Sequence, residues 1–328
     1  MGIRSGRAQA TQSVESDRVG LTCVRVEITA AGNLGIASTP TTPASSGPDA
    51  AIPRLAAVPA GFSAAAPFPA VPLLVALHGW LLSGRLWEPL RHELEPFLPC
   101  WCPDLPGFGG RPRPKGLQPS LASYGRWLAD EIRSQAGGRP VVLLGHSLGG
   151  SVALHAAPHL GSQLRGLVQV AAGGGVYQPR PFARLRQGGS AFLALRPAWL
   201  AHLPALAPWR SPLLAEPRAA RGLLACSTNR GAVGQLPRLT ASLGVPNLWI
   251  AGSRDGVMEA RYVRHLAGYS RQHRLELLEG AGHLPMRQMP RRLAAVIQNW
   301  LLEEGILAGA ALLETPLQGS DPALAEAI

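Results

Sequence analysis

Six short runs of apolar residues recur along the middle of the chain, and most of them end in glycine or another turn residue. They lie at 71–80, 100–109, 140–150, 164–174, 245–256 and 273–283. A continuous apolar run bounded by turn residues is typical of a strand buried on both faces of a sheet. Helix-like stretches, such as those at 120–135 and 151–160, separate several of these runs. The alternation predicts an α/β fold with a mostly parallel, doubly wound sheet and right-handed crossovers.

The same pattern divides the chain into zones. Residues 1–69 are rich in Pro, Ser, Thr and Ala, which predicts a disordered or accessory N-terminal extension. Residues 70–175 and 245–304 carry the predicted strands and form the predicted core. Between them, 176–244 lacks a buried-strand run and predicts a helical cap inserted over the sheet. Residues 305–328 hold acids and no base, which predicts a loose acidic tail.

Composition adds a large core and a basic charge. Hydrophobic residues make up 46% of the 328 residues, enough for a sizeable core. The net charge is +11, and because Lys115 is the only lysine, 30 of the 31 basic residues are arginine. Basic charge suits nucleic acid or an anionic membrane. The chain lacks a nucleic-acid-binding module and basic residues interleaved with aromatic ones, so we expect no nucleic-acid partner.

Cysteine usage and the N-terminus predict a cytoplasmic protein. Cys100 and Cys102 form C-x-C, which matches neither the redox C-x-x-C motif nor a paired zinc-ligand spacing. We expect these two, Cys23 and Cys226 to be reduced thiols. The first 20 residues contain no apolar segment of a secretory signal. The chain contains no uninterrupted run of about 18 apolar residues, so we expect no transmembrane helix.

One motif predicts a nucleophile. Gly145-His146-Ser147-Leu148-Gly149 is a G-x-S-x-G sequence that follows a predicted strand and precedes a predicted helix. So sharp a turn strains the backbone of the serine, and small flanking residues avoid a clash. The serine then lies at a helix N-terminus, where backbone N–H groups favour negative charge. We predict that Ser147 is a catalytic nucleophile.

A serine hydroxyl needs a general base, and the base needs an acid that orients it. Asp255 in GSRDGV and His283 in GAGHLP each follow a predicted strand, in the chain order Ser, acid, His. Catalytic groups gather at such strand ends in open α/β sheets. Each residue alone also fits a local role, as a turn-capping aspartate or a loop histidine. Together they predict a triad with Ser147.

The tetrahedral intermediate of acyl transfer needs N–H donors aimed at its oxyanion. One predicted donor is the backbone N–H of Leu148, directly after the nucleophile. The other is the backbone N–H of Trp80, which ends the His78-Gly79-Trp80 sequence after the first core strand. Gly79 has no side chain, which permits a close approach of the loop backbone to the oxyanion. We expect the indole of Trp80 to pack beneath the cap.

Taken together, the motifs HGW, DLPGFG, GHSLGG, GSRDGV and GAGHLP resemble the α/β-hydrolase superfamily, in the subgroup with an H-G-x oxyanion loop and a helical cap. The resemblance covers residues 71–304. It implies that Ser147 is the nucleophile, His283 the base and Asp255 its orienting acid. Arg111 departs from the family pattern, because a small serine is usual at that position. We expect it to lie at the entrance or to be a solvated loop charge.

Cofactor and metal motifs fail on inspection. GFGGRP after the predicted strand at 100–105 lacks the third glycine of a dinucleotide-binding loop, and no phosphate-binding G-x-x-x-x-G-K-[ST] exists. His155 and His159 are four residues apart, but Ala156 replaces the glutamate of H-E-x-x-H. We therefore expect neither a cofactor nor a metal ion.

The predicted cap bears on the substrate. It contains nine arginines and one acid, Glu216, for a net charge of +8. We expect Trp199 and Trp209 to line an apolar substrate pocket there. The arginines would suit an anionic acyl or carboxylate substrate, although an Arg-rich composition alone also accounts for them.

Three functions follow as hypotheses. The first is a serine hydrolase that cleaves a carboxylic ester or thioester with an apolar group through an acyl-Ser147 intermediate. The second is a C–C or elimination lyase, similar to the cap-bearing triad enzyme of the menaquinone and phylloquinone pathway, acting on an anionic substrate. The third is a non-catalytic ligand-binding or membrane-surface protein whose cap makes a peripheral membrane contact.

Overall fold

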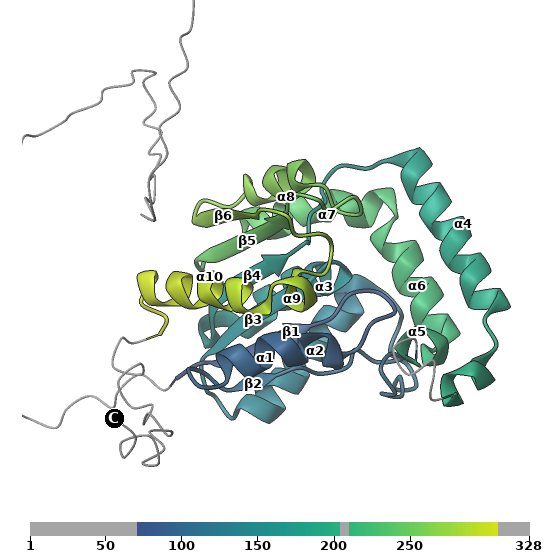
Figure 1. The fold of residues 1–328 in the computed structure, drawn as a ribbon, viewed down its shortest axis with the longest axis horizontal. Coiled ribbons are helices and arrows are strands. Elements are labelled where there is room, and N and C mark those ends of the chain that lie inside the picture. Colours follow the sequence, from purple (N-terminus) through teal and green to yellow (C-terminus); the bar gives the residue numbers. More distant parts are fainter. Residues whose placement is uncertain (1–70, 204–209, 308–328) are drawn as a thin grey trace, which may run out of the picture. The chain divides into compact units, whose positions relative to one another are not determined.

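The centre of the molecule is a six-stranded sheet in which every neighbouring pair of strands is parallel, in the order β2-β1-β3-β4-β5-β6 (Figure 1). The computed structural model describes residues 71–203 and 210–307. The strands are β1 (Leu73–Leu77), β2 (Cys100–Trp101), β3 (Val141–His146), β4 (Leu164–Val170), β5 (Asn247–Gly252) and β6 (His273–Leu278). The predicted parallel α/β sheet is therefore confirmed.

Some predictions concern other parts of the chain. The predicted extension 1–69, Cys23, Trp209 and all but the first residues of the predicted tail 305–328 lie outside the described residues.

One predicted strand is much shorter than its apolar run. The run at 100–109 yields only the two residues of β2. Pro103, two residues after the end of β2, has no N–H to donate to a strand ladder. After it, Gly107, Gly109 and Gly110 have positive φ, so the backbone turns rather than extends.

Helices cover both faces of the sheet. They are α1 (Glu88–Leu94), α2 (Leu121–Ala136), α3 (Leu148–Leu160), α8 (Ala260–Ala267), α9 (Pro285–Gln288) and α10 (Pro290–Glu303), with the 3-10 turns η1 (Gly84–Trp87) and η2 (Gly161–Gln163). Neighbouring strand residues face opposite sides. Val75 and Leu143 join the apolar cluster under α2, α3 and α8. Leu74 and Val142 join the cluster under α1 and α10.

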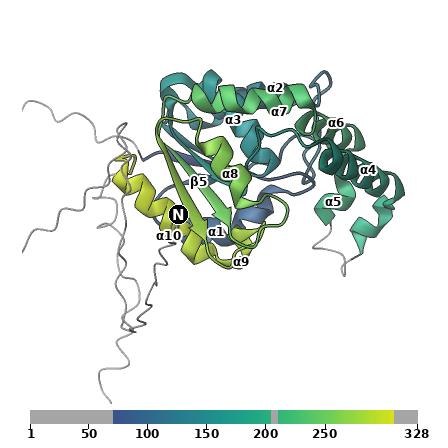
Figure 2. The ribbon, with the colours of Figure 1, turned by 90° about the horizontal axis from the view of Figure 1, so that it is seen from above.

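The interval 176–244, which we call the cap, is helical. It contains α4 (Pro179–Leu195), the 3-10 turn η3 (Ala198–His202), α5 (Arg210–Leu214), α6 (Pro217–Ser227) and α7 (Arg230–Ala241), and no strand in its described part. Figures 1 and 2 show α4, α5 and α6 together on one side of the sheet and its covering helices, whereas α7 lies close to α8.

The sheet order changes direction next to β1. The chain passes from β1 to the edge strand β2 and then crosses to β3 on the other side of β1. In open α/β sheets, ligands bind outside the carboxyl ends of the strands at such a switch point. The loops that begin at His78, after β1, and at Ser147, after β3, therefore define the expected site.

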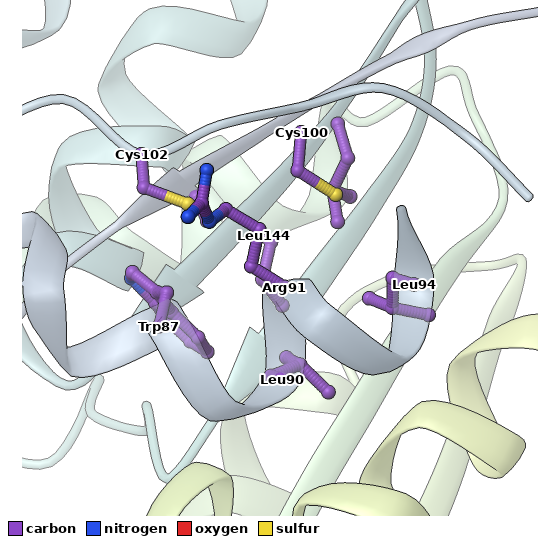
Figure 3. A pocket seen from close by; sticks show the side chains of 9 residues that line it. Trp87, Leu90, Arg91, Leu94, Cys100, Cys102 and Leu144 are labelled. Atoms are coloured by element: carbon purple, nitrogen blue, oxygen red, sulfur yellow. The ribbon is translucent and has the colours of Figure 1, made fainter. Parts of the chain in front are cut away.

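A small cavity on the α1 side is part of the core packing. Trp87, Leu90, Arg91 and Leu94 line it together with Cys100 and Cys102, and the guanidinium of Arg91 lies beside the thiol of Cys102 (Figure 3). Burial raises the pKa of each thiol to about 12. Both therefore remain protonated near neutral pH and are poor nucleophiles and metal ligands.

Candidate active site

Ser147 occupies a sharp turn between β3 and α3. Its backbone has φ 52° and ψ −120°, a region that a residue with a side chain enters only under strain. Its N–H donates to the carbonyl oxygen of Val170 on the neighbouring strand at 3.1 Å. The turn thus presents the serine at the carboxyl end of the sheet.

The glycines on either side of Ser147 have no room for a side chain. A Cβ on Gly145 would lie 2.5 Å from the Cα of Gly150. A Cβ on Gly149 would lie 2.5 Å from the carbonyl oxygens of Leu77 and His78. The G-x-S-x-G pattern is therefore required by the close approach of β1, β3 and α3.

Asp255 and His283 meet at the neighbouring strand ends, after β5 and β6. The Oδ2 of Asp255 lies 2.9 Å from the Nδ1 of His283, and its Oδ1 accepts the backbone N–H groups of Val257 and Met258, each at 2.8 Å. Burial acts to raise the pKa of Asp255, but the hydrogen bond from His283 and those from the backbone outweigh it and hold that pKa below its ordinary value. The acid is therefore an ionised carboxylate.

This carboxylate fixes the tautomer of His283. An ionised carboxylate only accepts hydrogen bonds, so Nδ1 of His283 carries a proton. In the neutral ring, Nε2 is then the basic nitrogen. The pair has the donor, acceptor and charge that a general base and its orienting acid require.

The loop after β1 holds its backbone in a defined orientation. The buried ring of His78 accepts the N–H of Leu105 at its Nε2 (2.9 Å), so its Nδ1 carries the proton and donates to the carbonyl oxygen of Gly79 (2.8 Å). The next peptide is trans, as are all peptides of the described chain, so the N–H of Trp80 points away from that carbonyl. His78 thereby orients the predicted oxyanion donor.

The second predicted donor lies at the start of α3. Leu148 is the first residue of this helix, and the first N–H groups of an α-helix have no intrahelical partner. A Cβ on Gly79 would lie 3.3 Å from the Cβ of Ser147, so the loop after β1 runs directly beside the elbow.

The side chain of Trp80 connects this loop to the cap. Its indole Nε1 donates to the carbonyl oxygen of Ala220 on α6 at 2.9 Å. The far edge of the ring lies beside Gly189 of α4, where a Cβ would come within 2.8 Å of it. The indole thus packs against two cap helices, as expected from the sequence.

A second connection joins the loop after β2 to the cap. The Nε of Arg113 donates to Oε2 of Glu216 at 2.9 Å, and the same oxygen caps α6 by accepting the N–H of Ala219 at 2.8 Å. A groove of about 310 Å³ lies here, between Gly107 and Arg113 on one side and Leu214 and Glu216 on the other. Glu216, the single acid of the cap, is therefore used in holding the cap to the core.

Arg111 belongs to the rim of the same groove. Its guanidinium forms an ion pair with Glu131 at 2.8 Å and lies over the ring of Trp127, 4.8 Å from its centroid. Both partners lie on α2, so the residue that departs from the family pattern is tied to the core rather than freely solvated.

The cap arginines fall into two groups. Arg186 and Arg196 are half-buried and donate to backbone carbonyl oxygens of other cap residues. The others are exposed: Arg180, Arg184, Arg210, Arg218, Arg221, Arg230 and Arg238. Among the described residues, none of these seven has a carboxylate partner, so the outer cap surface carries a concentrated positive charge.

Several large apolar side chains are exposed on the same surface. Leu185, Phe192 and Leu195 on α4 are 48%, 37% and 80% exposed. Trp199, predicted to line a substrate pocket, lies on η3 and is 64% exposed. Its role in substrate binding stays a prediction.

Two residues with clear contacts received no role from the sequence. His78 lies within the H-G-W motif and His146 within G-x-S-x-G, and neither motif assigns a function to its histidine. His78 accepts from the backbone of Leu105 and His146 donates to the backbone of His283, each on a distant loop, and no local pattern identifies such partners.

Two kinds of feature are absent from the described residues. No cluster of three or more His, Cys, Asp or Glu side chains is arranged to hold a metal ion there. Nor does that part of the chain contain a helix long and apolar enough to cross a membrane.

Comparison with known proteins gives consistent results. The model of the alpha/beta hydrolase family matches residues 74–296. A pimeloyl-[acyl-carrier protein] methyl ester esterase of Xanthomonas axonopodis pv. citri is 31% identical over 254 residues, covering 70% of this chain and 95% of the relative. The enzyme of the same name from Xanthomonas oryzae pv. oryzae is 32% identical over 253 residues, with the same coverage.

Solved structures show the same fold. A thermophilic esterase from Thermogutta terrifontis superposes with a TM-score of 0.58 at 21% identity, covering 71% of this chain and 90% of its own. The structure of MenH from S. aureus superposes with a TM-score of 0.57 at 20% identity, covering 73% and 97%.

Proposed function

This chain belongs to the alpha/beta hydrolase family and is a serine hydrolase, and on that premise we propose that it cleaves a carboxylic ester through an acyl-Ser147 intermediate. The observation that carries the proposal is the 2.9 Å contact between His283 Nδ1 and Asp255 Oδ2 beside the strained turn of Ser147. It supplies a base whose tautomer and orientation are set before substrate binds.

The mechanism follows from these groups. Nε2 of His283 takes the proton from Oγ of Ser147 as the oxygen attacks the ester carbonyl carbon. The oxyanion that forms accepts the backbone N–H groups of Trp80 and Leu148. The tetrahedral intermediate collapses, the C–O bond to the alcohol breaks, and His283 gives its proton to the departing oxygen. Water, activated by His283, then hydrolyses the acyl-enzyme and restores Ser147.

For the substrate we propose the methyl ester of an acyl chain held on an acidic carrier protein. Relatives that share about 30% identity with this chain carry that activity in their names. The seven exposed arginines support it, because a positive surface steers a negatively charged partner toward the site. The apolar acyl chain would enter beneath the cap.

A panel of p-nitrophenyl esters from acetyl to palmitoyl, hydrolysed by the wild type and Ser147→Ala, tests the chemistry. We expect turnover by the wild type, loss of about three orders of magnitude or more in the variant, and labelling of Ser147 by a fluorophosphonate. A folded wild type that is neither active nor labelled would contradict a serine hydrolase mechanism.

The carrier substrate needs a separate test. We expect Arg180→Glu/Arg184→Glu to raise KM for an acyl-carrier-protein methyl ester and to leave p-nitrophenyl ester hydrolysis unchanged. Added salt should weaken only the carrier reaction, because it screens exposed charges. Equal effects on both substrates would remove the carrier protein from the proposal.

The same variants address the lyase hypothesis. A lyase that acts on a small dicarboxylate would not hydrolyse simple esters even as the wild type. Substitution of the cap arginines would abolish the elimination or C–C cleavage reaction of that dicarboxylate. Ester turnover by the wild type that depends on Ser147 favours hydrolysis over that alternative.

The exposed apolar residues of α4 favour one further contact, with a membrane surface. Leu185, Phe192 and Leu195 are exposed on the helix that also exposes Arg180 and Arg184, a combination typical of interfacial helices. Co-sedimentation with anionic liposomes, reduced by Leu195→Ser and unaffected by Ser147→Ala, is the expected result. Equal sedimentation of wild type and Leu195→Ser would contradict it.

A further inference from the structure

His146 is the residue directly before Ser147, and its ring lies at the centre of the site. It is the last residue of β3 and has no exposed surface. Its ring centroid is 4.8 Å from that of His283, with the planes tilted by 57°. On the other side, the ring of Trp87 meets it edge-on at 6.4 Å.

One nitrogen of His146 has a defined partner. Its Nε2 lies 2.8 Å from the backbone carbonyl oxygen of His283. A carbonyl oxygen only accepts, so Nε2 carries the proton and donates it. Burial, reinforced by the neighbouring His283, lowers the pKa of His146 to about 3, so the ring is neutral near neutral pH.

The other nitrogen lies against the loop after β1. Nδ1 of His146 is buried and has no hydrogen-bond partner in the described part of the chain. A Cβ on Gly79 would lie 2.8 Å from it, so this edge of the ring fills the space beside the backbone that leads to Trp80. The ring of His146 therefore contacts His283 and the loop at Gly79, and its backbone is joined to Ser147 by a peptide bond.

We propose that His146 is a positioning residue for His283. Its ring N–H donates a hydrogen bond to the backbone carbonyl oxygen of His283 and so holds the base in place. The proposal rests on the proposed ester cleavage through acyl-Ser147 and adds the group that fixes the base from the main-chain side. Asp255 holds the ring of His283 at Nδ1, and His146 holds its backbone. Two attachments at different points restrict both the position and the rotation of the base.

The uncharged state of His146 is part of this role. When His283 takes the proton of Ser147 it becomes a cation, and a second cation 4.8 Å away would oppose that step. A buried neutral ring supplies a donor without adding charge. An arginine or lysine could also donate to the carbonyl, but it would repel the imidazolium.

Two amide variants distinguish a hydrogen-bond donor at the Nε2 position from the mere polarity of the side chain at residue 146. Gln has its amide nitrogen about where Nε2 of His146 lies, whereas the amide of Asn reaches only to the position of Nδ1. His146→Gln should therefore keep the bond to the His283 carbonyl and retain kcat within about fivefold. His146→Asn and His146→Phe, which lack a donor at that point, should lose about tenfold to a hundredfold in kcat with little change in KM.

A matched control is available on α3. His155 is also a buried histidine, and its Nε2 has no hydrogen-bond partner among the described residues, but it packs against Gly125 of α2. His155→Phe should leave kcat unchanged, which separates the loss of the His146 donor from the effect of a phenylalanine in the core. Far-ultraviolet circular dichroism and melting temperature establish that each variant is folded.

The measurement is p-nitrophenyl ester turnover together with the rate of fluorophosphonate labelling of Ser147. A wild type that is neither active nor labelled overturns the proposed function, and this proposal with it. An active wild type whose His146→Asn and His146→Gln variants have equal kcat, or whose His146→Phe variant matches it, overturns the positioning role alone. If His146→Phe does not fold, the Asn and Gln pair still decides.

Discussion

The indole Nε1 of Trp80 donates a hydrogen bond to the carbonyl oxygen of Ala220, 2.9 Å away and 140 residues further along the chain. The backbone N–H of the same tryptophan is the proposed oxyanion donor. One residue thus belongs to the catalytic loop through its main chain and to the cap through its side chain. Cap position and oxyanion geometry are therefore physically coupled.

We expect Trp80→Phe to weaken this coupling. Phenylalanine keeps an aromatic ring beneath the cap but has no N–H for the Ala220 carbonyl, a loss of about 1 kcal/mol. A less firmly held cap should raise KM for long-chain esters several-fold and change kcat less. Trp127→Phe on α2 is the control, since that indole lies under the guanidinium of Arg111 and the Ala220 carbonyl accepts from Trp80 instead. An unchanged KM for Trp80→Phe would show that the cap does not depend on this bond.

Asp255→Asn should reduce kcat by about three to four orders of magnitude. The backbone N–H groups of Val257 and Met258 hold one side-chain oxygen, so the amide NH₂ of the variant would face Nδ1 of His283. That arrangement moves the ring proton to Nε2 and leaves no base for Ser147. Esterase assays with Asp130→Asn as a surface control check this. Retention of a tenth of wild-type kcat would contradict the assigned role.

Gly79→Ala should damage catalysis by crowding. The added methyl group would lie 2.8 Å from Nδ1 of His146 and displace the loop that carries the N–H of Trp80. A shift of about 1 Å at this donor should cost roughly a hundredfold in kcat.

Gly188→Ala is the matched control for that change. A Cβ there would have no neighbour within 4 Å, and the residue lies inside α4. We expect unchanged activity and a gain of about 0.5–1 kcal/mol in the free energy of unfolding, because alanine favours helix over glycine. Equal activity of the two variants would show that Gly79 is not constrained by the site.

His155→Leu should make the protein less sensitive to acid. Burial lowers the pKa of His155 to about 4, whereas its ordinary value is 6.5. The unfolded chain therefore binds a proton that the folded chain does not, and stability present above pH 6.5 is lost as pH falls toward 4. Leucine does not titrate, so the variant lacks this loss of stability, which is worth about 1–2 kcal/mol of unfolding free energy at pH 5. Urea unfolding at pH 8 and pH 5 measures the free energy of unfolding of both proteins. If the variant and the wild type differed by the same free energy at both pH values, His155 would not contribute to acid sensitivity.

Local patterns predicted much of the fold and the candidate triad. Buried parallel strands need continuous apolar runs, so five of the six strands lie inside the runs that predicted them and fill half or more of each. The elbow at Ser147 needs glycines on both sides, because Gly145 and Gly149 contact backbone from β1 and α3. Asp255 and His283 follow strands, and the carboxyl ends of parallel strands share one edge of a sheet.

Other relationships required the tertiary structure. His146 contacts the backbone of a residue 137 positions away, and Arg113 meets Glu216 across 103 positions. Neither pairing leaves a periodicity or a motif in the sequence. The sequence by itself therefore determined the parallel sheet, the strained elbow and the order of the candidate catalytic residues, because these depend on local backbone geometry and burial. Only the folded chain decided what holds those residues in place, since hydrogen bonds between distant loops depend on where the sheet and the cap bring them together.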